Sequence, residues 1–110
     1  MQVFPYEIEY YKTKDGFAPI RDWLEALLDI NGRARIRIRL DRARLGNLGD
    51  HKHLGDGAWE LRLDCGPRYR ICFAKEENRL ILLLLGEDKS TQRRDIAQAG
   101  GYLRDYRRRH

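Results

Sequence analysis

The stretch AWELRLDCGPRYRICF, residues 58–73, carries the clearest structural signal in the chain. Large apolar residues alternate with mostly charged ones on both sides of Cys65-Gly66-Pro67, a combination that predicts two strands joined by a tight turn. With that turn as the loop, the apolar residues meet in three cross-strand pairs: Leu63–Tyr69, Leu61–Ile71 and Trp59–Phe73. A slip of one residue would place apolar against charged side chains, so the pattern specifies this register.

The same register places Arg62 opposite Arg70 on the other face of the hairpin. Like charges that face each other across two strands are unfavourable, so something must compensate them. One explanation is structural, because Glu60 and Asp64 lie on that face and could pair with both arginines. The other is functional, because two convergent guanidiniums hold a phosphate better than one. The residues alone leave both explanations open.

The rest of the chain predicts five further elements and one long loop. In order they are a strand at 6–11, a helix at 17–30 that stops at Asn31-Gly32, a helix at 33–45, a polar loop at 46–57, and, after the hairpin, a buried strand at 80–85 and a final helix capped by Ser90 or Thr91. The resulting order, β-α-α-β-β-β-α, predicts an α+β domain with a small, mostly antiparallel twisted sheet backed by helices.

Residues 33–45, RARIRIRLDRARL, fit the pattern of either a strand or a helix. We favour a helix because the segment is long and consists of strong helix formers. Its apolar residues then form two stripes on opposite sides: Ala34, Ile38 and Leu45, and Ile36, Leu40 and Ala43. Such a helix would pack on the sheet with one side and on another helix, or on a partner, with the other.

The composition predicts one domain, residues 1–110, that attracts polyanions. Lysine and arginine outnumber aspartate and glutamate by 22 to 17, and the excess charge suits nucleic acid or an acidic protein partner. The two cysteines, Cys65 and Cys72, form no metal spacing and are too few for a secreted disulfide scaffold. We find no signal segment, and the apolar run at 80–85 is too short to cross a bilayer, so we expect a cytoplasmic protein without membrane contact.

Two polar segments carry candidate chemistry. The loop at 46–57 holds His51, Lys52 and His53, which we expect to reach the arginine face of the hairpin, and histidine suits proton transfer at a ribose or phosphate. A solvated loop explains the two histidines equally well, and no third ligand for a metal is evident. The segment 86–92 leads from the buried strand into a helix, where backbone amides and Lys89 favour an anion, but its spacing excludes a nucleotide-binding P-loop.

Taken together, these pieces resemble the RelE/HigB superfamily of type II toxins, in particular the phage-related addiction-module killer proteins. The resemblance covers 17–102, and its matching pieces are Trp23-Leu24, GNLGD at 46–50 with Lys52 and Leu54, WELR at 59–62, GPRYR at 66–70, the strand at 82–85 and GEDKSTQRRDI at 86–96. It implies two N-terminal helices packed on a twisted sheet and a mobile C-terminal helix. It also implies a cognate helix-turn-helix antitoxin and mRNA cleavage at the ribosome without a metal or other cofactor.

Carried over by position, the resemblance assigns catalytic roles to Arg62, Arg70, Lys89 and His53. The two arginines would hold the scissile phosphate, Lys89 would complete the cationic cluster, and Lys52 with His53 would transfer protons or contact the RNA backbone. We expect further RNA contacts from the same segments: His51, Lys52, Arg68, Thr91, Gln92 and Arg93. The chain departs from the family in reading Glu87-Asp88-Lys89 where relatives place a tyrosine or histidine, so the general base and acid stay unassigned.

Two other functions fit the same residues. A ParE-like toxin would share the fold and inhibit DNA gyrase by protein contact, with the cationic face bound to an acidic surface. A nucleic-acid-binding module without toxicity is the third possibility. In-frame cuts in mRNA after induction would distinguish the nuclease from both.

Overall fold

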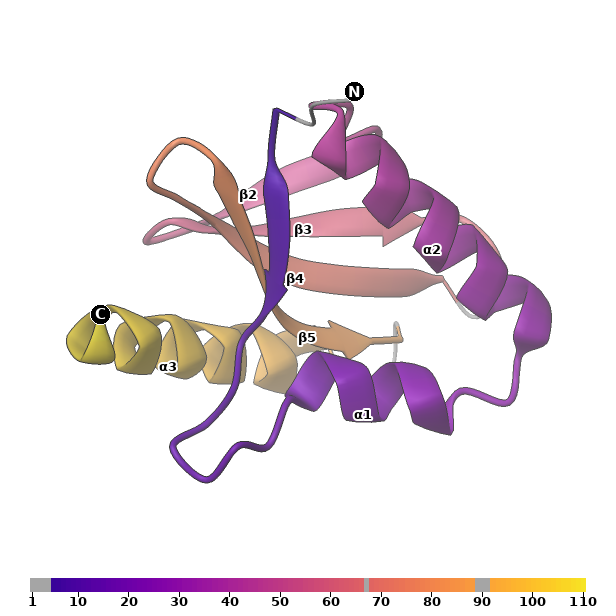
Figure 1. Ribbon diagram of the computed structural model, residues 1–110. Helices are drawn as coiled ribbons and strands as arrows, with labels where there is room; N and C mark the ends of the chain where they lie inside the picture. The colour runs from indigo at the N-terminus through magenta and orange to yellow at the C-terminus, as the bar shows by residue number, and fades with distance from the viewer. Residues whose placement is uncertain (1–4, 67, 89–91) are drawn as a thin grey trace.

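The computed structural model describes the backbone of residues 5–66, 68–88 and 92–110, with side chains except at 92–95 (Figure 1). The elements in chain order are β1 (Glu7–Tyr10), α1 (Pro19–Ala26), α2 (Ile30–Arg44), β2 (His51–Gly55), β3 (Ala58–Leu63), β4 (Tyr69–Glu76), β5 (Leu80–Glu87) and α3 (Gln92–Arg109). The fold is therefore α+β, as the sequence predicts.

The strands form one five-stranded mixed sheet in the order β1-β5-β4-β3-β2. β1 pairs with β5 in parallel, and the other three pairings are antiparallel, which confirms a mostly antiparallel sheet. The strand β2 was not expected, because the segment 46–57 carries the polar and glycine-rich composition of a loop. The element order is consequently β-α-α-β-β-β-β-α.

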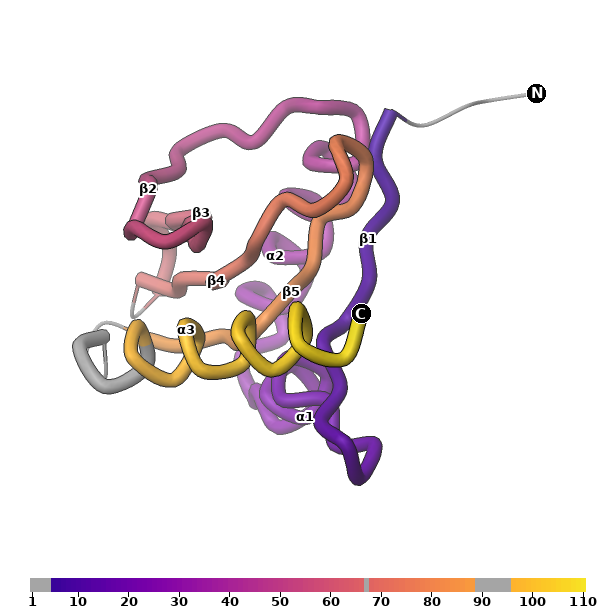
Figure 2. The backbone as a smooth tube through the Cα atoms, turned by 90° about the vertical axis from the view of Figure 1, so that its left-hand side faces the viewer, coloured from indigo at the N-terminus to yellow at the C-terminus, as the bar shows by residue number. Residues whose placement is uncertain are grey.

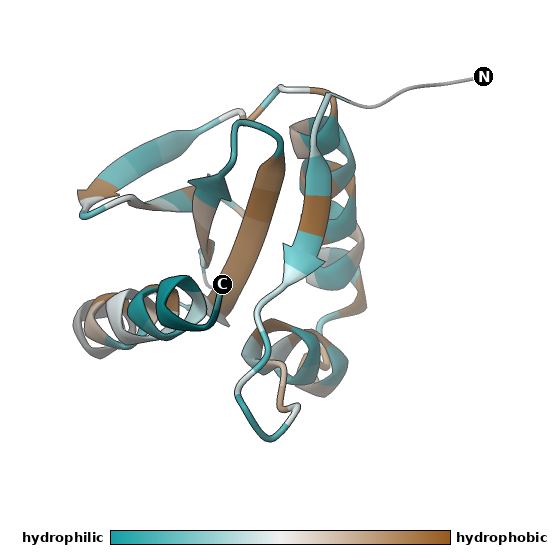
Figure 3. Ribbon diagram, turned by 60° about the vertical axis from the view of Figure 1, so that its left-hand side comes forward, coloured by the Kyte–Doolittle hydropathy of each residue, from teal (hydrophilic) through white to brown (hydrophobic). Residues whose placement is uncertain are grey.

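The hairpin has the predicted register. Leu63 pairs with Tyr69, Leu61 with Ile71 and Trp59 with Phe73, and Arg62 lies directly opposite Arg70. The apolar run in β5 is covered on both sides, as expected for a central strand, and it is the brown strand in the middle of Figure 3. Ile81 and Leu83 belong to one core, and Leu82 and Leu84 to the other.

The boundary between the first two helices differs from the prediction. α1 ends at Ala26, and Asn31-Gly32 lies inside the first turn of α2 instead of stopping a helix. The reason is Asp29, whose side chain caps α2 by accepting a hydrogen bond of 3.0 Å from the Gly32 amide. Glycine is required there, because a Cβ on residue 32 would lie 2.6 Å from both Asp29 and the ring of Tyr69.

The segment at 33–45 is helical, as predicted, and its two apolar stripes have different environments. Ile36, Leu40 and Ala43 are buried against the sheet. The other stripe faces outward, with Ile38 49% and Leu45 53% exposed. One side of α2 therefore completes the core, and the opposite side carries apolar groups in contact with solvent.

The sheet separates two cores. α1 and α2 cover one face, which we call the α2 face, and α3 lies along β4 and β5 on the other, which we call the α3 face (Figure 2). The C-terminal half of α3 is held by Tyr11, whose hydroxyl donates a hydrogen bond to Asp105. Burial, together with this hydrogen bond, raises the pKa of Tyr11 to about 12.

Two further predictions concern the N-terminal cap of the last helix and the lack of a transmembrane segment. Ser90 and Thr91, the predicted helix cap, lie outside the described residues. Within the described ranges, none of the helices combines the length and the apolarity that a transmembrane span needs.

Candidate functional site

A row of four charged residues crosses the α3 face of the sheet where β3 ends and β4 begins. Arg62 on β3 pairs with Arg70 on β4, and Arg70 pairs with Glu87 on β5. On the other side of Arg62, Asp50 accepts a backbone hydrogen bond of 2.9 Å from the Arg62 amide just before β2 begins. We call Asp50, Arg62, Arg70 and Glu87 the charged row.

Arg62 is flanked by two carboxylates. Its Nε lies 3.7 Å from Oε1 of Glu60 and 3.9 Å from Oδ1 of Asp50. Glu60 is only 1% exposed, whereas 39% of the Arg62 side chain is accessible. The structural explanation of the paired arginines is thus confirmed for Glu60 but not for Asp64, which instead pairs with Arg68 at 3.8 Å.

Several polar atoms of this region are buried without a hydrogen bond from or to the described residues. They are Nε of Arg62, Nη1 of Arg70 and Oε2 of Glu60. Most buried polar atoms in folded proteins have a hydrogen-bond partner, because the unpaired group loses its hydration without compensation. The ion pairs of this region therefore leave part of its hydrogen-bonding capacity unused among the described residues.

The residues of β2 divide between the two faces of the sheet. Lys52 pairs with Glu60, so it shares the α3 face with the charged row. His51 and His53 pair with Leu61 and Trp59, which places both rings on the α2 face. The prediction that the histidines reach the arginine face is therefore wrong, because neighbouring residues of a strand point to opposite sides.

Instead, the two histidines surround Trp59. The ring of His53 lies 4.7 Å and that of His51 5.6 Å from the Trp59 ring, centroid to centroid, and Nζ of Lys75 lies 4.8 Å from the centroid of Trp59. This cluster shields a half-buried tryptophan on β3, next to the edge strand β2. It gives the histidines a packing role on the side opposite to the arginines.

The other predicted site residues are only partly described. Arg68 lies in the turn after β3 with 60% of its side chain exposed. Gln92 and Arg93 begin α3, but their side chains are not among those described, and Lys89 and Thr91 fall outside the described residues altogether. The structure thus brings together Arg62, Arg70 and Lys52.

Sequence reasoning did not identify Arg39 of α2 as part of this region. Its guanidinium donates hydrogen bonds to the carbonyls of Arg62, Leu48 and Asp50, at 2.6, 2.8 and 3.0 Å. These bonds tie the segment before β2 to the end of β3, and so fix Asp50 beside Arg62. The many arginines of α2 look alike in the sequence, and nothing there distinguishes Arg39.

The other side of the sheet under the charged row is rigidly packed. Trp23 of α1 lies edge-on against Tyr69, with 5.7 Å between the ring centroids, and a Cβ on Gly86 would lie 2.2 Å from Trp23. The hydroxyl of Tyr69 donates to Asp29 at 2.9 Å. Burial first, and then this hydrogen bond, raises the pKa of Tyr69 to about 12. These contacts fix the starts of α2 and β4 relative to β5.

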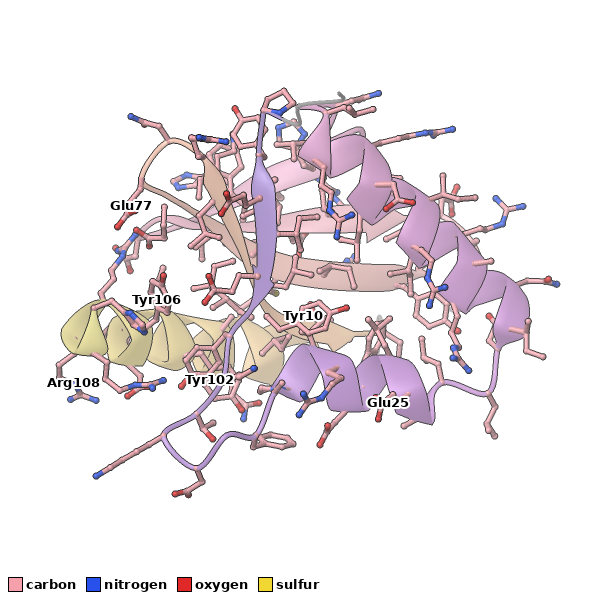
Figure 4. All side chains as sticks on the ribbon, in the orientation of Figure 1. Tyr10, Glu25, Glu77, Tyr102, Tyr106 and Arg108 are labelled. Atoms are coloured by element: carbon pink, nitrogen blue, oxygen red, sulfur yellow. The ribbon has the colours of Figure 1, made fainter. Side chains whose placement is uncertain are left out.

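A groove with a volume of about 1050 Å³ lies between β1, α1, α2 and the C-terminal end of α3. Its lining includes Tyr10 and Glu25, which Figure 4 labels on β1 and α1. Four of its cations form no ion pair with the described residues: Lys12, Lys14, Arg33 and Arg37. Apolar side chains, Ile36 and Leu40 among them, line its floor. The groove is thus a second basic surface, separate from the charged row.

A search of the described side chains finds no group of three or more histidine, cysteine, aspartate or glutamate residues arranged to hold a metal ion.

Comparison with known proteins identifies a relative in Haemophilus influenzae (strain ATCC 51907 / DSM 11121 / KW20 / Rd), described as an uncharacterized protein. The two sequences are 44% identical over 77 residues, which are 70% of this chain and 78% of the relative. No family model matches the chain. An identity of this size over most of both chains shows common descent and a common fold, and the chain therefore belongs to the same family as this uncharacterized Haemophilus influenzae protein.

Proposed function

We propose that the protein is the toxin of a toxin–antitoxin pair, with a RelE/HigB-like fold, and that it cleaves mRNA at the ribosome without a metal ion. The observation that carries the proposal is the pairing of Arg62 with Arg70 on the α3 face, where 39% of the Arg62 side chain is accessible and Nη1 of Arg70 has no hydrogen bond to the described residues. The order of elements, with two helices before the hairpin and one after β5, agrees with the fold that the sequence resemblance implies.

The chemistry is an attack of the ribose 2′-oxygen on the neighbouring phosphorus. The 2′-oxygen loses its proton, the phosphorus–5′-oxygen bond breaks, and the leaving 5′-oxygen gains a proton, which leaves a cyclic phosphate on one fragment. The phosphate gathers negative charge on the way, and cations close to it lower that barrier. Arg62 and Arg70 have the position for this task, and Lys52 shares their face of the sheet.

The cognate partner would be a helix-turn-helix antitoxin that keeps the toxin inactive in the cytoplasm. The basic groove between β1, α1 and α2 supports such a partner, because its unpaired cations and apolar floor fit an acidic, amphipathic segment. The outward stripe of α2, with Ile38 and Leu45, provides further apolar surface.

The proposal is tested by inducing the protein in bacteria that lack the partner and mapping the ends of transcripts. We expect growth arrest and new in-frame ends within translated mRNA, with both effects lost in Arg62→Ala and Arg70→Ala. Arg35→Ala is the matched control, since Arg35 is exposed on α2, away from the charged row. It should arrest growth like the parent.

Two outcomes would replace the proposal. Growth arrest with intact transcripts and inhibited DNA gyrase would identify a ParE-like toxin. Harmless expression of a folded protein that still binds RNA or DNA would identify a simple binding module.

A further inference from the structure

Glu60 is the most deeply buried charged residue described near the charged row. It is 1% exposed and lies on the α3 face of β3, between Lys52 of β2 and Cys72 of β4. Placing an ionised carboxylate in such an environment is costly unless a cation and hydrogen bonds compensate it. Its compensation is incomplete, because Oε1 approaches Arg62 at 3.7 Å while Oε2 receives no hydrogen bond from the described residues. Fold stability alone does not explain a charge held in this way.

The contact between Glu60 and Arg62 involves one end of the guanidinium. Glu60 approaches Nε, and Asp50, just before β2 begins, approaches the same Nε. Nε is itself buried, although 39% of the Arg62 side chain is accessible. A guanidinium has five donors in a fixed planar arrangement. Nε faces the two carboxylates on the inside at ion-pair distances, without a hydrogen bond, so the two Nη groups form the end that remains for a ligand.

We propose that Glu60 is a positioning residue that orients the Arg62 guanidinium, so that its Nη groups meet the phosphate held jointly with Arg70. The inference rests on the proposed function and specifies how its site is prepared. Glu60 acts through Arg62 and does not touch the RNA. Its burial keeps the carboxylate from competing with the phosphate for the outer end of the arginine.

Two variants separate this role from the alternatives. Glu60→Gln keeps an acceptor oxygen for Nε but removes the charge, and Glu60→Leu removes both. Positioning predicts that Glu60→Gln cleaves mRNA on programmed ribosomes at a rate within about threefold of the parent. Glu60→Leu should lose tenfold or more in kcat with little change in KM, because an oriented cation contributes most at the transition state. In an Arg62→Ala background, Glu60→Leu should have no further effect.

Other roles give other results. A purely electrostatic role predicts that both variants bind RNA more tightly, and to the same extent, since each removes one negative charge. A purely structural role predicts that kcat falls in proportion to the fall in the urea midpoint of each variant. It also predicts that the loss of kcat in Glu60→Leu adds to the loss in Arg62→Ala. Either result would overturn the proposal. If Glu60→Leu does not fold, Glu60→Asp replaces it, and positioning then predicts a loss of kcat although the charge is kept.

A measurement independent of cleavage tests the orientation itself. The ¹⁵Nε–¹Hε NMR signal of Arg62, assigned by its absence in Arg62→Ala, should be sharp in the parent and in Glu60→Gln. It should broaden through solvent exchange in Glu60→Leu. An unchanged signal in Glu60→Leu would contradict the proposal whatever the RNA shows. If the parent leaves mRNA intact while the Arg62 signal still depends on residue 60, the nuclease function fails and the orientation of Arg62 by Glu60 stands.

Discussion

On the α3 face of the sheet, β3 and β4 carry Glu60, Arg62 and Arg70, whereas on the α2 face the same two strands carry Trp59, Tyr69 and Phe73. The α2 face is closely packed, and Trp23 leaves no room for a side chain on Gly86. The α3 face near the turn holds buried polar atoms without described partners. The hairpin therefore combines a closely packed apolar side, which fixes the backbone, with a polar side that carries the charged residues of the proposed site.

The largest expected effect concerns the polar side. Arg62→Ala should lower the rate of mRNA cleavage by about 100-fold or more, the range seen when a charge-stabilising donor is removed from an active site. The measurement is single-turnover cleavage on programmed ribosomes, with the urea midpoint of each variant as a check on folding. Arg35→Ala is the matched control, since Arg35 is an exposed arginine on α2, away from the charged row. Equal losses in the two variants would mean that the charged row has no special role.

The second prediction concerns the rigid side. Gly86→Ala should reduce the free energy of unfolding by about 1–3 kcal/mol, because its Cβ would overlap Trp23 in a packed core. Urea denaturation measures this loss, and Trp23→Leu in the same chain should recover part of it by making room. Gly101→Ala is the control, since the nearest atom to its Cβ would be 3.8 Å away and alanine favours a helix. A Gly86→Ala protein as stable as the parent would show that this face is not closely packed.

A smaller effect is expected from the hydroxyl of Tyr69. Tyr69→Phe removes its hydrogen bond to Asp29 and should cost about 1 kcal/mol in the free energy of unfolding near pH 7. Since the pKa of Tyr69 is raised from 10.0 to about 12, the unfolded chain ionises first, and stability is lost as the pH rises through that interval. Burial also raises the pKa of Tyr11 and of Tyr106, so Tyr69→Phe should release about one proton fewer than the parent on unfolding in this interval.

Urea denaturation at several pH values between 9 and 12 measures the free energy of unfolding of the parent and of Tyr69→Phe. Tyr102→Phe is the control. An alkaline slope that is identical in the parent and in Tyr69→Phe would rule out the contribution of this hydroxyl.

The smallest effect tests the division of β2 between the two faces. His53→Ala should change the rate of cleavage by less than about threefold, because the imidazole packs on Trp59 on the side opposite to Arg62. Lys52→Ala, its neighbour on the other face, should reduce the rate more. The measurement is the rate of mRNA cleavage by each variant at a fixed ribosome concentration. A folded His53→Ala protein without activity would contradict the prediction and assign His53 a role in catalysis.

The charged row could be predicted from the sequence in part. Apolar and charged residues alternate on both sides of a short turn. This alternation specified the register of β3 and β4, and with it the pairing of Arg62 and Arg70. Of the two strands that flank the hairpin, β5 was predicted from its apolar run, but β2 was not. β2 lies at the sheet edge, where three of its five residues are exposed, and its sequence HKHLG carries no apolar pattern that marks a strand.

The local elements could be predicted from the residues alone: the hairpin and its register, the central apolar strand, and the helix α2 with its two apolar stripes. They follow from side-chain periodicity within one segment. Which distant groups meet is visible only once the chain is folded. Contacts between segments far apart in the chain set three such features. They are the separation of His53 from Arg62, the burial of Glu60, and the contact of Trp23 with Gly86. Packing between elements sets such contacts, and no periodicity within a single segment encodes them.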